Sequence, residues 1–66
     1  MPTVHIEIWS GKPEELKRNL ARAVTDVMVE HVGCEPRAVM VIFDEVPKQN
    51  WFTGGQCHTE IFKGTR

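Results

Sequence analysis

Residues 13–33 read PEELKRNLARAVTDVMVEHVG and carry the strongest secondary-structure signal in the chain. Its apolar positions recur with the spacing of one face of an α-helix. Pro13 suits the first helical position, because its missing N–H has no partner there. Gly33 is placed to end the helix as the residue just beyond it. The pattern predicts a helix of roughly five turns, whose apolar stripe consists of Leu16, Leu20, Ala23, Val24, Val27, Met28 and Val32.

A candidate strand lies on each side of this helix. Residues 3–9 (TVHIEIW) alternate, with Val4, Ile6 and Ile8 on one face, which is typical of a half-buried strand. Residues 38–43 (AVMVIF) are almost continuously apolar, which favours a parallel strand covered on both faces. Strand, helix and strand in this order predict a βαβ unit, whose crossover is right-handed in nearly all proteins.

The residues after the second strand predict a hairpin. Beyond residues 44–47 (DEVP), the aromatic pair Trp51 and Phe52 precedes Gly54-Gly55, which favours a tight turn. We expect a small hairpin there, followed by a short strand over residues 57–61. The predicted fold class is therefore α+β: a single βαβ unit with parallel strands and a C-terminal hairpin.

The length of the chain predicts an oligomer. With 66 residues there is room for one domain, residues 1–66, and such a short chain is marginally stable as a monomer. One helix covers only one face of the sheet. The other face of the first strand carries Thr3, His5, Glu7 and Trp9, which are mixed in character. We expect that face to be a subunit interface, with the C-terminal hairpin reaching onto a neighbour.

Composition argues against several classes of function. The net charge is −1 and no basic run is present, so we expect no nucleic-acid partner. No apolar run approaches the ~18 residues of a membrane span, and the first residues do not form a signal peptide. We therefore expect a cytoplasmic protein without a membrane partner. Cys34 and Cys57 are too few for a disulfide framework and lack the spacing of a metal site, so we expect no metal.

Pro2 is the residue with the most distinctive possible chemistry. If Met1 is removed, Pro2 carries a free secondary amine, a group that no internal proline offers. A generic α-amine has a pKa of ~7.7–8.0, and burial in an apolar pocket lowers this value further. Such an amine is a general base poised near the working pH. An unprocessed chain has an amide at Pro2 and no base.

These features together resemble a known family. A Met-Pro start on a strand, Gly11 followed by a cation, one long helix, a strand ending Val41-Ile42-x-x-Glu45, and aromatic residues before Gly54-Gly55 occur in this order. The chain resembles the 4-oxalocrotonate tautomerase family, the short members of the tautomerase superfamily. The resemblance implies a βαβ subunit that assembles into a dimer or a hexamer, uses no cofactor and acts on small unsaturated keto or enol acids.

The resemblance also assigns roles to particular residues. Pro2 falls on the catalytic proline, and Lys12 falls where the family commonly has a substrate-binding arginine. Trp51 falls on the aromatic residue that lines the pocket and helps keep the proline amine deprotonated. Met40 stands where the family's tautomerases commonly have an arginine in the second strand. Arg37 is the candidate replacement, although on a regular strand it projects to the opposite face.

Three functions are consistent with the sequence. The first is a tautomerase that uses Pro2 as base and then as acid, with Lys12 stabilising the dienolate oxygen. The second is a hydratase or dehalogenase in which protonated Pro2 is the acid. It needs a carboxylate to activate water; Thr53 lies near the place where that carboxylate is expected, and Asp44 and Glu45 are only remote candidates. The third is a non-catalytic oligomeric binding protein, favoured by the missing strand arginine. We assign no role to the three histidines, His5, His31 and His58.

Overall fold

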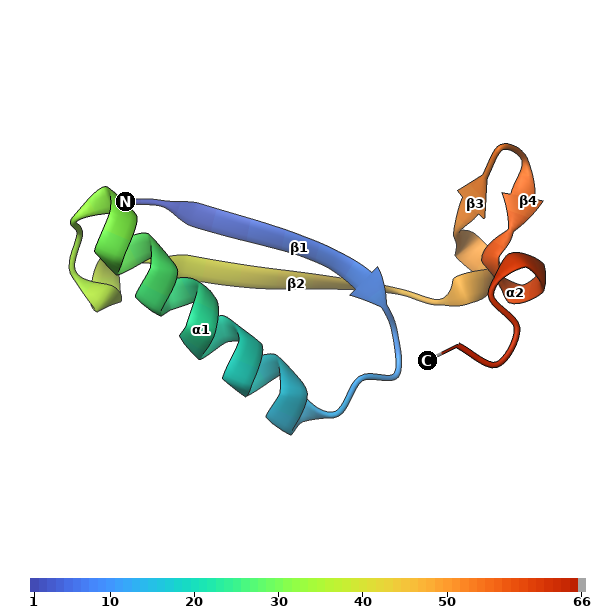
Figure 1. Ribbon diagram of the computed structural model, residues 1–66, viewed down its shortest axis with the longest axis horizontal. Helices are drawn as coiled ribbons and strands as arrows, with labels where there is room; N and C mark the ends of the chain where they lie inside the picture. The colour runs from blue at the N-terminus through green and yellow to red at the C-terminus, as the bar shows by residue number, and fades with distance from the viewer. Residues whose placement is uncertain (66) are drawn as a thin grey trace.

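A two-stranded parallel ribbon forms the centre of the computed structural model, which describes residues 1–65 (Figure 1). β1 (Thr3–Trp9) pairs with β2 (Met40–Val46) over its whole length, from Thr3 opposite Met40 to Trp9 opposite Val46. The helix α1 (Glu14–Val32) connects the two strands and lies along one face of the ribbon. The predicted βαβ unit is confirmed.

The ends of α1 follow the signals in the sequence, but part of its apolar stripe is exposed. The helix follows Pro13 and ends at Gly33, whose φ is 80° and whose N–H donates to the Val29 carbonyl at 3.0 Å. The half-buried positions on the helix include Ala21, Val24 and Met28. Ala21 was not in the predicted apolar set, and four members of that set are 36–57% exposed: Leu16, Leu20, Val27 and Val32.

The second strand lies further along the chain than the apolar run predicts. Pro36 begins a short 3₁₀ helix, η1 (Pro36–Ala38), so Ala38 is not in the strand. β2 continues instead through the acidic pair Asp44 and Glu45, because β1 supplies seven residues for it to pair with. The predicted strand is confirmed, and its bounds of 38–43 are wrong at both ends.

The C-terminal segment forms a separate small unit beyond the end of β2. The 3₁₀ helix η2 (Lys48–Asn50) leads into a hairpin of β3 (Phe52–Thr53) and β4 (Gln56–Cys57), which confirms the predicted turn. The expected strand over residues 57–61 is wrong, because α2 (His58–Ile61) begins directly after β4. A longer hairpin needs an extended partner before β3, and the chain is helical there.

The chain leaves a large apolar surface open. Its extents are 42 × 25 × 14 Å and its radius of gyration is 14.7 Å, whereas a compact domain of this length has about 11 Å. Among residues 1–65 no hydrophobic side chain is buried. On the ribbon face opposite α1, Met40 is 47% and Ile42 44% exposed. Within the same residues, no helix has the length and apolar character needed to cross a membrane.

Candidate active site

The candidate residues divide between the two ends of the ribbon. At the end where the chain begins, Pro2 directly precedes β1, and its carbonyl oxygen accepts the N–H of Met40 at 3.0 Å. Pro2 is half-buried. While Met1 is attached, its nitrogen belongs to a tertiary amide and has no basic lone pair. The structure therefore places the candidate base beside the residue that stands in for the family's strand arginine.

Arg37 lies near this same end of the ribbon but not on a strand. It is exposed in η1, which is closed by the N–H of Val39 donating to the Pro36 carbonyl at 3.1 Å. The expectation that Arg37 projects to the opposite face from Met40 assumed a regular strand between them. The strand begins only at Met40, so that argument does not apply. A role for Arg37 as the replacement cation stays a prediction.

Lys12 lies at the other end of the ribbon, in the turn between β1 and α1. The preceding residue, Gly11, has a φ of 98°, a conformation that a side chain at this position would strain. Lys12 is half-buried, and no carboxylate among residues 1–65 lies within ion-pair distance of it. Its ammonium group is therefore available to an anionic ligand.

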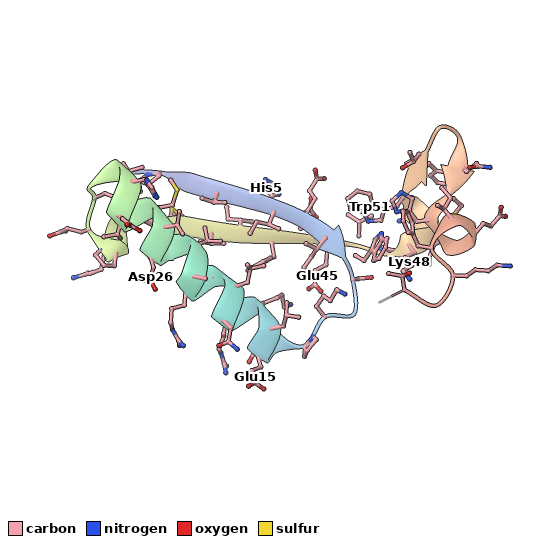
Figure 2. The ribbon with its side chains drawn as sticks, in the orientation of Figure 1. His5, Glu15, Asp26, Glu45, Lys48 and Trp51 are labelled. Carbon is pink, nitrogen blue, oxygen red and sulfur yellow. The ribbon has the colours of Figure 1, made fainter. Side chains whose placement is uncertain are left out.

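Two cavities open beside Lys12. The first, of about 360 Å³, is also lined by Trp51 and His58, together with Glu7, Ile8 and Trp9. The second, of about 550 Å³, is lined by a second cation, Lys48, as well as by Trp9 and Leu16. The Lys48 ammonium lies 4.5 Å from the centre of the Trp9 ring, a favourable cation–π arrangement. In Figure 2, Lys48 and Trp51 lie together at the start of the C-terminal unit.

Trp51 is held in place from several sides. Its indole N–H donates to the Val46 carbonyl at 2.9 Å, and its own carbonyl accepts the N–H of His58 at 2.9 Å. The His58 ring stacks on its indole, with 5.5 Å between ring centres and 23° between planes. The sequence predicted Trp51 as a pocket wall, and the structure places it on the Lys12 cavity.

The sequence analysis missed His58. It is the one buried residue among those described, at 8% exposure. It hydrogen-bonds Trp9, 49 residues away, and packs against Phe62. The expectation that Trp9 belongs to the outer sheet face is incomplete, since Trp9 also contacts this cluster. The sequence shows only a histidine shortly after the Gly54-Gly55 turn, and from this position alone its hydrogen-bond partners cannot be predicted.

Pro2 is far from Lys12 and Trp51 within one chain. Seven residues of β1 separate Pro2 from the turn that carries Lys12, and a strand of that length spans about 23 Å. Figure 1 shows the amino terminus and the C-terminal unit at opposite ends of the ribbon. A site that uses all three residues has to be assembled from at least two chains.

Comparison with known proteins agrees with this fold. Residues 2–60 match the sequence model of a family described as tautomerase enzyme. The chain belongs to the tautomerase family. One relative, a probable tautomerase of Dickeya dadantii, is 41% identical over 61 residues, which cover 91% of each chain. The 2-hydroxymuconate tautomerase of Comamonas testosteroni is 36% identical, over 92% of this chain and 97% of its own.

Solved structures of tautomerases share the fold. A structure from work on the 4-oxalocrotonate tautomerase isozymes of Methylibium petroleiphilum matches with a TM-score of 0.85 and 37% identity, covering 91% of this chain and 97% of that one. A heterohexameric 4-oxalocrotonate tautomerase from Chloroflexus aurantiacus matches with a TM-score of 0.86 and 30% identity, covering 92% and 98%. The resemblance seen in the sequence is confirmed, and membership of the family supports a tautomerase-type function.

Proposed function

We propose that this chain is the subunit of a cofactor-independent tautomerase that moves a proton within small enol or unsaturated keto acids. Pro2, freed by removal of Met1, is the general base and then the general acid. The observation that carries the proposal is the family match from residue 2 onward, together with the position of Pro2 at the open start of β1. One alternative, ligand binding without catalysis, is an outcome of the test below; the other, a hydratase or dehalogenase with protonated Pro2 as acid, predicts little tautomerisation in either protein.

The proposed site lies between chains. Lys12 and Trp51 share a cavity that Pro2 of the same chain is too far away to reach. On the ribbon face opposite α1, exposed Met40 and Ile42 give a second chain apolar contacts. The same face carries the exposed His5–Asp44 pair, so the surface offered to a partner is mixed. The related heterohexamer supports assembly of the same general kind here. A dimer or a hexamer of this chain brings Pro2 of one subunit to Lys12 and Trp51 of another.

The chemistry then proceeds in two proton transfers. The Pro2 amine removes a proton from the enol oxygen, or from the carbon next to the carbonyl, so that an O–H or C–H bond breaks and an N–H bond forms. The resulting dienolate carries negative charge on oxygen, which the Lys12 ammonium stabilises. The proline ammonium then returns the proton to a distal carbon. Trp51 excludes water and disfavours the charged form of the amine.

Two measurements test this proposal. Mass spectrometry of the protein from its native host reports whether Met1 is removed. The tautomerisation of phenylenolpyruvate and of 2-hydroxymuconate is then compared between the parent chain and Pro2→Ala. We expect a loss in kcat of about a hundredfold, within the usual contribution of general acid–base catalysis. Equal activity of the two proteins rules out proline catalysis, and a retained Met1 favours a non-catalytic binding protein.

A further inference from the structure

His58 has both ring nitrogens engaged inside the protein. Nε1 of Trp9 lies 3.0 Å from Nδ1 of His58, and Oγ1 of Thr53 lies 2.9 Å from its Nε2. The ring is enclosed by three aromatic side chains. It stacks on Trp51 and meets Trp9 and Phe62 edge-on, at centre distances of 5.7 and 4.9 Å. No ring nitrogen is left free to act on a ligand in the neighbouring cavity.

These contacts define the tautomer of His58. The indole N–H of Trp9 is a donor only, so Nδ1 of His58 has to accept and carries no proton. The proton of the neutral ring is then on Nε2, which donates to the hydroxyl oxygen of Thr53. This arrangement fits one protonation state of the ring and excludes the other two.

His58 also makes two of the contacts that hold Trp51. It stacks on the indole ring and donates its backbone N–H to the Trp51 carbonyl. We propose that His58 is the positioning residue for Trp51, and that it holds this wall only as the neutral ring with its proton on Nε2. The inference rests on the proposed function in one respect: it takes Trp51 to be a wall of the substrate site.

A second proton on the His58 ring disrupts these contacts. A second proton on Nδ1 directs two N–H donors at each other across 3.0 Å, and Trp9 loses its acceptor. Of the charged groups around the ring, Glu7 and Lys12 line the same cavity, and the Lys48 ammonium lies over Trp9. Cys57 precedes the ring in β4, and Glu60 is exposed on α2.

No carboxylate compensates for a charge on the ring. Among residues 1–65, none lies within ion-pair distance of His58. A positive ring therefore adds to the positive charge of Lys12 and Lys48. We expect the aromatic cluster to open in acid, with Trp51 leaving the wall of the cavity.

Spectroscopy tests the inference on the folded protein without reference to activity. ¹⁵N NMR of the histidine rings reports the tautomer and the protonation of His58, and the emission of the chain's two tryptophans, which both contact His58, reports the cluster. We expect the Nε2–H tautomer at neutral pH, and an emission change on acidification with the same midpoint as the His58 titration. A ring protonated on Nδ1 at neutral pH overturns the inference.

Variants separate the ring from its nitrogens. His58→Phe keeps an aromatic ring against Trp51 but cannot titrate, so the acid transition in emission should disappear. His58→Asn retains an acceptor near the position of Nδ1 and should also lack the transition, which provides a second reading if His58→Phe folds poorly. His31→Phe, at an exposed site in the last turn of α1, is the matched control and should leave the transition unchanged. A transition that persists in both His58 variants contradicts the inference.

Kinetics then connect the cluster to the proposed site. His58→Asn removes the ring that stacks on Trp51, so in this variant we expect KM to rise roughly tenfold with a smaller change in kcat, because a displaced wall weakens binding more than proton transfer. In the parent chain KM should rise in acid as His58 takes up its second proton, and this rise should be absent from the His58 variants. Failure of proline catalysis appears as full activity in Pro2→Ala. Failure of the present inference appears as the wrong tautomer or as an unchanged KM in His58→Asn, so the two are distinguished.

Discussion

At the end of the ribbon where the chain begins, Pro2 and Met40 share one backbone hydrogen bond, and Arg37 is exposed nearby. At the other end, Trp51 and His58 belong to a cluster joined by side-chain hydrogen bonds and stacked rings. The first end offers a single reactive group with little around it. The second offers a shaped cavity lined by Lys12 and by the acidic residue Glu7, but it lacks the proline amine. If Pro2 is the base, as we propose, the reactive group and the binding cavity meet only when chains assemble.

The largest expected effect comes from preventing that meeting. Ile42→Lys places a charge on the exposed ribbon face, where it costs little in a single chain but is buried without a partner in an assembly. We expect dissociation, measured by analytical ultracentrifugation, and a loss of activity of at least about a hundredfold. Asn19→Lys, on the exposed side of α1, is the control and should change neither. A fully active monomer contradicts the two-chain site.

The next effect tests the cavity end alone. Lys12→Ala removes a charged hydrogen-bond donor, and such a bond is worth about 1.5–3 kcal/mol. We expect KM for a carboxylate substrate to rise by roughly ten- to a hundredfold, with the assembly intact. Lys12→Arg should recover most of the loss, because the guanidinium fork also binds carboxylates. If Lys12→Ala binds substrate normally, the ammonium does not contact the anion.

A gain in activity is expected from a substitution at the amino-terminal end of the ribbon. Met40→Arg introduces a cation beside Pro2, on a side chain that is already half exposed. We expect kcat/KM for the dicarboxylate 2-hydroxymuconate to rise roughly tenfold, because bidentate charge-assisted hydrogen bonds favour a carboxylate. Phenylenolpyruvate, with one carboxylate, should gain less. Met40→Leu controls for the change of shape, and an equal gain there rules out charge as the cause.

The smallest effect distinguishes the ring of Trp51 from its hydrogen bond. Trp51→Phe keeps an aromatic wall and removes only the donor to the Val46 carbonyl. We expect urea unfolding to show a loss of about 1 kcal/mol, and activity close to that of the parent. Trp9→Phe should cost more, because it leaves Nδ1 of the buried His58 without a donor. The reverse order contradicts the assignment of His58 as the centre of the cluster.

Sequence patterns predicted the βαβ unit of β1, α1 and β2 well, because these elements follow local rules. The alternation over residues 3–9 gives β1, and Gly33 ends α1 with the positive φ that glycine favours. The bounds of β2 were wrong because the length of its partner, rather than its own polarity, sets where pairing stops. Asp44 and Glu45 lie in the strand despite their charge, and Glu45 pairs with Lys17 of α1 at 2.7 Å.

The end of the ribbon that carries the cavity of Lys12, Trp51 and His58 was only partly predictable, because long-range contacts define it. Gly54-Gly55 correctly predicted the hairpin, but no local pattern indicated that His58 begins a helix. Its place depends on Trp9, at the far end of the sequence, and on the ring of Trp51. No periodic pattern records a hydrogen bond between residues 9 and 58. Pro2, Lys12 and Trp51 were found through the family resemblance, which does not say how far apart one chain holds them.

Mixing two impaired variants, assayed with substrate well below KM, tests the two-chain site most directly. Pro2→Ala chains lack the base and Lys12→Ala chains lack the cation, so each alone should be weak. In a mixed dimer of the two, one site combines an intact Pro2 with an intact Lys12, while the other site lacks both. Co-expression in equal amounts should then restore about a quarter of the parent activity, because about half of randomly paired dimers are mixed. Activity no greater than the average of the two variants contradicts a site shared between chains.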